Sequence, residues 1–209
     1  MLKPLLLLFS LLPFCSASAE QKGALRMRDL FASMPDSLLP LLSTNNRLDC
    51  LDFIENNMEA KVRNLVDDFS ELKRLTSDYL LLEQSQQSRV EMKMIASSDS
   101  TAHIVVSATV FGPVADSEVR IYDERWRLLS AVPRPSVAAF FDRVTDEMEQ
   151  QNILAQLRDL PLLDARLSPE EPTITWTLSL DVLEKKDRAL VSPHLRPVRS
   201  ALSAIAPLP

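Results

Sequence analysis

The sequence predicts an α+β fold: a curved antiparallel β-meander with helices packed on one face. The first observation is a series of strand-like segments between residues 61 and 129, separated by short polar turns. Short connections favour antiparallel neighbours, because parallel strands need a long crossover. The second observation is helical periodicity on both sides of that series, near the N-terminus and around residues 136–160.

The N-terminal residues predict export. Lys3 precedes an apolar run over residues 5–12, and Ala17-Ser18-Ala19 places small residues at the two positions that determine cleavage. We therefore predict a signal peptide over residues 1–19, followed by a single α+β domain over residues 20–209.

Anchoring as a lipoprotein at Cys15 is the alternative for this end of the chain. It is less favoured, because Pro13 and Phe14 precede the cysteine where small residues are normal. After cleavage no stretch approaches the roughly 18 consecutive apolar residues of a spanning helix, so we expect no transmembrane segment. The predicted localisation is exported, either periplasmic or extracellular.

The charge of the sequence excludes some classes of partner, and its cysteine content excludes an internal disulfide. The formal net charge is −6 at pH 7, and loss of Lys3 with the signal peptide makes it −7. Because the sequence has no basic clusters, we expect neither nucleic acid nor an anionic membrane as a partner. Cys50 is the one cysteine left after cleavage, so no internal disulfide can form, and its apolar neighbours predict a buried thiol.

Two helices are predicted before the strands. Ser33, Pro35 and Asp36 are typical of a helix start, and Pro40 limits that helix to one or two turns. Residues 43–46 then supply capping oxygens for a second helix. Its predicted buried stripe has helical spacing and consists of Leu48, Leu51, Ile54 and Met58.

Five polar residues at the start of the second helix form the candidate binding site. Free backbone N–H groups at a helix start can bind an anion or a partner. The alternative is a capped helix with a solvated acidic side, since short polar residues are a common solution at a helix end. The five residues are Asn45, Asn46, Arg47, Asp49 and Asp52.

The predicted strands follow one another along the chain. Glu91 and Lys93 alternate with apolar residues, which predicts one buried and one wet face for their strand. Residues 103–111 are rich in β-branched side chains and predict the strongest strand. The predicted strands cover residues 61–66, 71–75, 79–82, 90–94, 103–111 and 118–122, followed by a short arm over 126–129.

A helix and a further strand are predicted in the last third of the chain. A helical stripe predicts a helix that begins at Ser136, with a bend or a second short helix near Gln150-Gln151. Residues 173–182 alternate apolar and polar side chains, which is typical of a half-buried strand. Prolines near the end predict a loose tail from about residue 197. The helical stripe consists of Val137, Phe140 or Phe141, Val144 and Met148.

One block of the sequence combines MPDSLLP at residues 34–40 with NNRLD at 45–49 and DF at 52–53, and LTSDYL, SRVEMK and FGP follow further on. These motifs resemble a family of secreted Bacteroidetes proteins known as a domain of unknown function. Cys50 departs from the pattern, where a larger apolar residue is expected, and the tail from Arg199 lacks an aromatic ending. The resemblance implies an exported or envelope location and carries over no catalytic residue.

Familiar catalytic and cofactor motifs are absent from the sequence. The two glycines, Gly23 and Gly112, cannot build a phosphate-binding loop or a dinucleotide turn. His103 and His194 lie far apart and outside any metal-binding motif, and the acidic segments lack the spacing of a calcium loop. We therefore expect no cofactor and no metal, and we assign no catalytic residue.

The sequence favours a non-catalytic cell-envelope protein that binds another envelope component, either a protein or a glycan. Contact would involve the wet face of the sheet or the polar cluster on the second helix. The alternative is a hydrolase of an envelope polymer that uses carboxylates brought together by the fold. A cleft holding two carboxyl groups at catalytic separation would favour the hydrolase.

Overall fold

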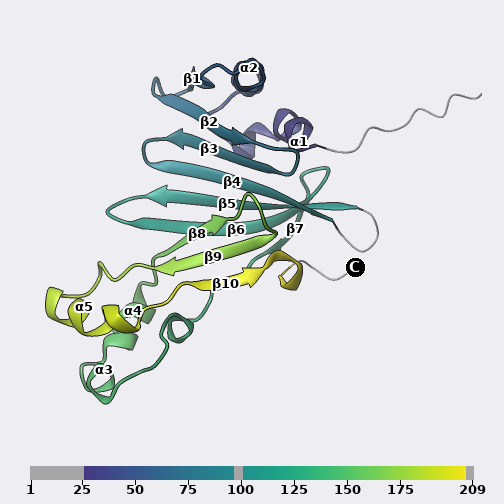
Figure 1. Ribbon diagram of the computed structural model, residues 1–209. Helices are drawn as coiled ribbons and strands as arrows, with labels where there is room; N and C mark the ends of the chain where they lie inside the picture. The colour runs from purple at the N-terminus through teal and green to yellow at the C-terminus, as the bar shows by residue number, and fades with distance from the viewer. Residues whose placement is uncertain (1–25, 97–100, 206–209) are drawn as a thin grey trace, which may run out of the picture.

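The computed structural model describes residues 26–96 and 101–205, which form an α+β fold with two antiparallel sheets (Figure 1). The α+β class of the sequence analysis is thereby confirmed. The predicted signal peptide and Cys15 lie outside the described residues. Within the described ranges no helix is long and apolar enough to cross a membrane.

The larger sheet is the predicted meander. Its seven strands follow chain order, and each strand is antiparallel to the next. The predicted strands between residues 61 and 129 are therefore confirmed, with shifts of a few residues at their ends. They are β1 (Lys61–Arg63), β2 (Phe69–Leu75), β3 (Tyr79–Ser85), β4 (Ser88–Ala96), β5 (Ala102–Phe111), β6 (Ala115–Asp123) and β7 (Leu128–Ala131).

The last third of the chain forms the second sheet. Its order is β10-β9-β8, and its neighbours are again antiparallel. β9 corresponds to the strand predicted at residues 173–182, whereas β8 has no counterpart in the sequence analysis. The three strands are β8 (Leu163–Leu167), β9 (Thr173–Leu178) and β10 (Val198–Ala201).

The helices form two groups. Figure 1 shows α1 and α2 beside the first strands, whereas α3, α4 and α5 gather at one end of the second sheet. The α-helices are α1 (Met27–Ser33), α2 (Thr44–Glu55), α3 (Asp146–Gln150), α4 (Ile153–Asp159) and α5 (Lys185–Val191). Single 3₁₀ turns lie at Asp36–Leu38, Val137–Phe140, Ser192–His194 and Leu202–Ala204.

Two hydrophobic cores lie on opposite faces of the larger sheet, because successive residues of a strand point to opposite sides. On β5, Ile104 and Val106 belong to the core that holds α1 and α2. Val105 belongs to the core that holds the second sheet, α3 and α4. The N-terminal helices therefore cover one face, and the later helices share the opposite core with the second sheet.

β8 lies against the larger sheet through its backbone edge. The Ala165 N–H donates to Ser117 Oγ at 2.9 Å, and the Ala165 carbonyl accepts from Ser107 Oγ at 2.9 Å. The Leu163 N–H donates to Asp116 Oδ1 at 3.2 Å. Side chains of β5 and β6 thus satisfy backbone groups on the edge of β8 that β9 leaves unpaired.

This packing overturns the prediction that Glu91 and Lys93 lie on a wet face. The two residues are only 1% and 2% exposed, because the second sheet covers this side of β4. Lys93 Nζ lies 2.7 Å from Asp78 Oδ2 and donates to the Pro169 carbonyl at 2.9 Å. The alternation of apolar and charged residues assigned the two faces of β4 correctly, but it could not indicate that a second sheet covers one of them.

The helix expected from Ser136 is interrupted. A single 3₁₀ turn is followed by a break, and Thr145 caps a separate helix by accepting a hydrogen bond from the Met148 N–H at 3.3 Å. Val144, expected on the inner face, is 40% exposed. The second short helix expected near Gln150-Gln151 is confirmed as α4.

The described part of the predicted loose tail, residues 197–205, forms regular structure. Val198–Ala201 pairs with β9 as strand β10, and the following turn buries Leu202 completely. Prolines predicted an irregular tail, but this short stretch can extend the second sheet and contribute a side chain to its core.

Candidate functional site

The structure divides the predicted polar cluster of α2 between the surface and the interior. Asn45, Asp49 and Asp52 are exposed. Asn46 forms a capping box with Ser43: the Ser43 N–H donates to Asn46 Oδ1 at 3.1 Å, and the Asn46 N–H donates to Ser43 Oγ at 3.2 Å. The capped helix that the sequence analysis kept as the alternative accounts for the position of Asn46.

Arg47 is a buried clamp rather than a surface residue. Its side chain is 2% exposed. Nη1 donates to the Leu42 carbonyl at 2.9 Å and to Asp36 Oδ1 at 2.8 Å, and Nη2 donates to the Met34 carbonyl at 2.7 Å. The guanidinium therefore ties the preceding segment to α2, and it is not free to contact a partner.

The buried side of α2 is rotated from the predicted stripe. Arg47, Cys50 and Leu51 are buried, whereas Leu48 and Met58 are 44% and 51% exposed. The predicted buried thiol is confirmed: Cys50 has no exposed surface, and burial raises its pKa to about 11. A thiol with that pKa is poorly suited to nucleophilic work at neutral pH.

A pocket of about 360 Å³ lies beside β8, at the end of the larger sheet where β3 turns into β4. It collects polar side chains from the first sheet and a guanidinium from the second. We call it the arginine pocket. Its lining consists of Leu81, Glu83, Ser85, Gln86, Ser88, Arg89, Phe111 and Arg166.

Arg89 forms the rigid wall of the arginine pocket and is only 6% exposed. Its Nη2 donates to Asp164 Oδ1 at 2.5 Å and to Thr109 Oγ1 at 3.1 Å. The guanidinium carbon lies 5.2 Å from the centre of the Phe111 ring, within the range of a cation–π contact. A guanidinium held on these sides loses little further freedom when it binds a ligand.

Glu91 joins both arginines behind the pocket. Its Oε1 accepts from the Tyr79 hydroxyl at 2.8 Å, and its Oε2 lies 3.1 Å from Arg166 Nε and 3.4 Å from Arg89 Nε. Burial raises the pKa of Glu91, although both guanidiniums and the Tyr79 hydrogen bond act in the opposite direction. Burial and the neighbouring Glu91 also raise the pKa of Tyr79.

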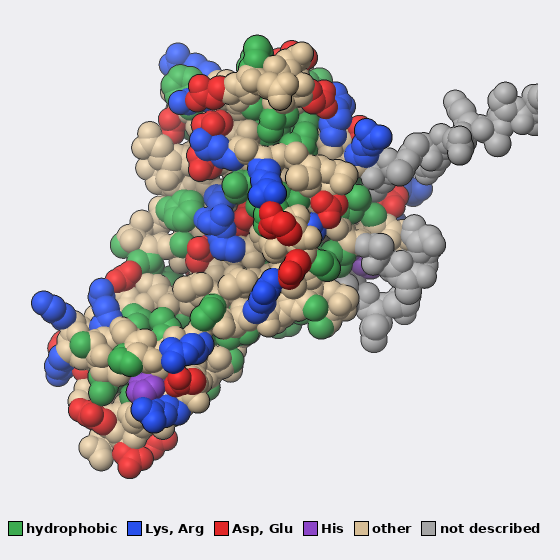
Figure 2. Space-filling view, viewed as in Figure 1, with side chains coloured by type: hydrophobic (Ala, Val, Ile, Leu, Met, Phe, Trp, Pro, Cys, Tyr) green, Lys and Arg blue, Asp and Glu red, His purple; other side chains and the backbone are tan. Residues whose placement is uncertain are grey.

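Part of this sheet face remains open to solvent. Cross-strand pairing places Lys61, Glu71, Glu83 and Arg89 in one row across β1 to β4. Figure 2 shows charged side chains of both signs gathered over these strands. A smaller pocket, of about 160 Å³, lies along this row. It shares Glu83, Ser85 and Gln86 with the arginine pocket. The rest of its lining consists of Lys61, Asp68, Phe69 and Glu71.

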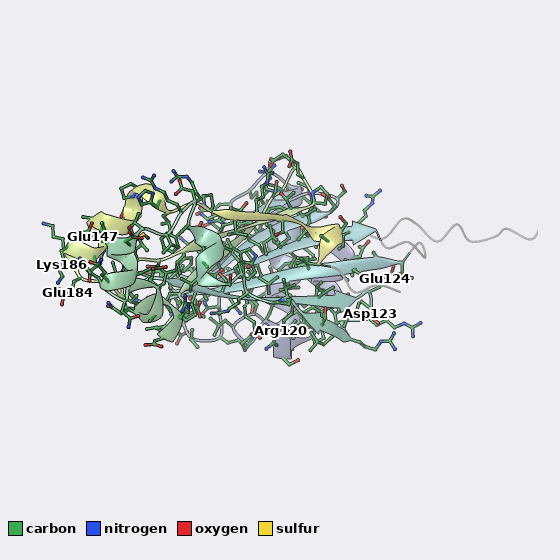
Figure 3. The ribbon with its side chains drawn as sticks, turned by 90° about the horizontal axis from the view of Figure 1, so that it is seen from below. Arg120, Asp123, Glu124, Glu147, Glu184 and Lys186 are labelled. Atoms are coloured by element: carbon green, nitrogen blue, oxygen red, sulfur yellow. The ribbon has the colours of Figure 1, made fainter. Side chains whose placement is uncertain are left out.

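A third pocket, of about 410 Å³, lies at the other end of β5 and is lined by His103, Asp123 and residues of the β6–β7 turn. Figure 3 shows Asp123 and Glu124 at the far end of the molecule from Glu184 and Lys186. Asp123 accepts from the N–H groups of two turn residues, Arg125 and Arg127, at 2.9 and 2.8 Å. Burial alone would raise the pKa of Asp123, but these hydrogen bonds lower it. The Asp123 carboxylate therefore stabilises the β6–β7 turn.

The arginine pocket was not predicted from the sequence. Arg89 and Glu91 lie within one of the motifs quoted above, on a strand that was predicted to have one buried and one wet face. The missing element was β8, where Asp164 and Arg166 alternate with Leu163, Ala165 and Leu167. That alternation is a strand signal in itself, but five residues are too few to show which sheet the strand joins.

Comparisons with known proteins agree with the fold. A solved structure described as "Structure of a domain of an uncharacterized protein from Porphyromonas gingivalis W83" is similar, with a TM-score of 0.69 and 24% identity. The match covers 82% of this chain and 91% of that chain. The similarity shows a shared fold. No curated protein matches the chain.

A family model described as "Protein of unknown function (DUF3256)" matches residues 19–201. The match includes every strand of both sheets and the whole lining of the arginine pocket. The resemblance to a domain of unknown function is therefore confirmed at the level of the family. The chain belongs to the DUF3256 family of proteins of unknown function.

Proposed function

We propose that this protein is an exported, non-catalytic component of a Bacteroidetes cell envelope that binds another envelope component through the arginine pocket. The observation that carries the proposal is the fixed guanidinium of Arg89 in the wall of a pocket of about 360 Å³. Concave sites of this size with a few well-placed polar groups are typical of ligand binding. Export rests on the sequence pattern of residues 1–19.

The chemistry of Glu91 supports binding rather than hydrolysis. A carboxyl group with a raised pKa is a candidate general acid. Glu91, however, is 1% exposed, lies behind both arginines and does not line the pocket. Its Oε1 accepts from Tyr79 and its Oε2 lies within ion-pair distance of both guanidiniums, so we assign it an electrostatic role in holding them.

The test is affinity capture from crosslinked cells with a variant that obstructs the pocket. Gln86 is exposed, lines the arginine pocket and makes no side-chain hydrogen bond among the described residues. Gln86→Trp should fill part of the pocket and reduce capture of the specific partner at least fivefold. Gln87→Trp is the matched control, because Gln87 is exposed in the same turn and does not line this pocket.

Equal capture by the wild type and both variants would remove the arginine pocket as the binding site. Export has an independent measurement: the N-terminal residue of the protein purified from its own cells. We expect cleavage after Ala19, whereas retention of Met1 would contradict export by a cleaved signal peptide.

A further inference from the structure

We propose that the arginine pocket recognises a carboxylate group, so that the bound envelope component presents a free carboxylate to Arg166 and Arg89. This inference rests on the proposed binding function and names its ligand chemistry. The protein leaves several N–H groups available in the pocket.

Arg166 presents an uncommitted fork of donors. Its side chain is 48% exposed, and its Nε lies 3.1 Å from Glu91 Oε2 as an ion pair. No hydrogen bond among the described residues uses its two terminal nitrogens. A guanidinium that pairs with a carboxylate at Nε and has no protein partner at its terminal nitrogens can bind a second carboxylate through two parallel hydrogen bonds.

Arg89 adds a second, more deeply placed donor. Its Nη2 donates to Asp164 and Thr109, and its Nε lies 3.4 Å from Glu91 Oε2 without a hydrogen bond. Nη1 has no hydrogen-bond partner among the described residues. Because Arg89 is 94% enclosed and lines the pocket, a ligand oxygen at Nη1 would form a charge-assisted bond shielded from water.

The charge around the pocket disfavours a doubly charged anion. The lining contains two cations, Arg89 and Arg166, and one anion, Glu83. Asp164 and Glu91 stand behind the cations and offset much of their charge. A phosphate monoester carries close to two negative charges at neutral pH and would meet Glu83 with little compensation, whereas a carboxylate carries one.

The remaining lining suits the group that carries the carboxylate. Phe111 and Leu81 offer apolar surface, and Ser85, Gln86 and Ser88 offer hydroxyl and amide groups. Both an acidic sugar and the carboxyl end of a peptide combine a carboxylate with polar and apolar parts. The shared chemistry is the carboxylate, and binding measurements distinguish these two sources.

The experiment is titration of the protein, by calorimetry or by NMR, with matched pairs of probes. Acetyl-Ala-Ala with a free carboxyl end is compared with its amide, glucuronate is compared with glucose, and inorganic phosphate is a separate probe. We expect at least one carboxylate probe to bind at least tenfold more tightly than its neutral partner and more tightly than phosphate, since one such bond is worth about a factor of ten.

The variants separate the pocket from general effects of charge. Arg166→Ala should lower the affinity for the carboxylate probe at least tenfold. Arg120→Ala should leave it unchanged: Arg120 is similarly exposed, at 42%, and pairs with one glutamate, but it lies in register with Val106 of the opposite core. Arg166→Lys keeps a positive charge beside Glu91 and controls for misfolding of Arg166→Ala. It should bind the carboxylate probe more tightly than Arg166→Ala does.

Some outcomes identify the source of the carboxylate, and others overturn the proposal. Binding of the peptide alone identifies a carboxyl terminus, and binding of glucuronate alone identifies an acidic sugar; both support the proposal. Tighter binding of phosphate, equal binding of the neutral partners, no binding of any probe, or indifference to Arg166→Ala would overturn it. Pocket-dependent capture by Gln86 variants would in that case still support the proposed function with another ligand.

Discussion

The backbone N–H of Ala165 donates to Ser117 Oγ at 2.9 Å, and this bond joins the edge of β8 to the face of the larger sheet. Ser117 is 1% exposed and also lies 2.8 Å from Thr109 Oγ1. One hydroxyl therefore serves both a strand edge and a buried polar side chain. Water cannot replace it easily at a site without solvent access.

Ser117→Ala should lower the free energy of unfolding by about 1–3 kcal/mol, because it leaves the Ala165 N–H buried without an acceptor. Urea unfolding followed by circular dichroism measures the change. Ser37→Ala is the control: Ser37 is exposed in the first 3₁₀ turn, and its replacement should cost less than about 0.5 kcal/mol. Equal stability of the two variants would mean that the edge of β8 does not depend on this hydroxyl.

Arg47→Ala should destabilise the protein by about 3 kcal/mol. The substitution leaves the carbonyl groups of Met34 and Leu42 without their donor and removes a buried guanidinium from α2. Asn45→Ala, on an exposed position of the same helix, should change the stability by less than about 0.5 kcal/mol. Thermal unfolding of both variants is the measurement, and a stable Arg47→Ala protein would refute the clamp.

Glu91→Gln should change the pH dependence of stability. Burial raises the pKa of Glu91 above its ordinary value of about 4.5, so the folded protein holds this proton more tightly than the unfolded chain does. The contribution of Glu91 to stability is therefore greatest below about pH 4.5 and falls as pH rises towards the raised pKa. Glutamine has no proton to lose there.

The measurement is urea unfolding of the wild type and Glu91→Gln across pH 4 to 8. The stability of the wild type relative to the variant should fall as pH rises. Asp78 and Asp123 have lowered pKa values and contribute in the opposite sense, but both are kept in the variant, so their effects cancel in the difference. A constant difference across the range would contradict a raised pKa of Glu91.

The Cys50 thiol should be almost unreactive in the folded protein. A pKa of about 11, compared with an ordinary value of 9.0, lowers the thiolate fraction at pH 8 by about 100-fold, and burial blocks access as well. A chromogenic disulfide reagent applied to the chain from residue 20 onward, with and without urea, measures the rate. Rapid labelling without urea would show that the side of α2 opens readily.

The sequence predicted the meander because each strand pairs with the next strand along the chain. Local alternation, as at Ile104, Val105 and Val106, is sufficient to assign such strands and their two faces. Contacts between segments that are far apart in the chain produce no such local pattern in the sequence. Ser107 and Ala165 are 58 residues apart, and no periodicity within either segment indicates that they meet.

The candidate site was harder to predict than the fold for the same reason. Arg47 looked like part of a polar surface, yet its guanidinium reaches back to carbonyl groups of the preceding segment and is buried. Glu91 and Lys93 were predicted to be exposed, yet a segment more than 70 residues later covers them. In both cases the partners that make burial of a charge tolerable are set by the tertiary structure.

The strand order of the larger sheet also implies an order of folding. Every pairing from β1 to β7 links neighbours in the chain, so this sheet closes only short loops and can form early. The second sheet depends on contacts of longer range and should dock later. In a chain whose larger sheet has formed but whose second sheet has not docked, Glu91, Ser107 and Ser117 would present polar groups to solvent on this face, whereas a fully apolar face would favour aggregation.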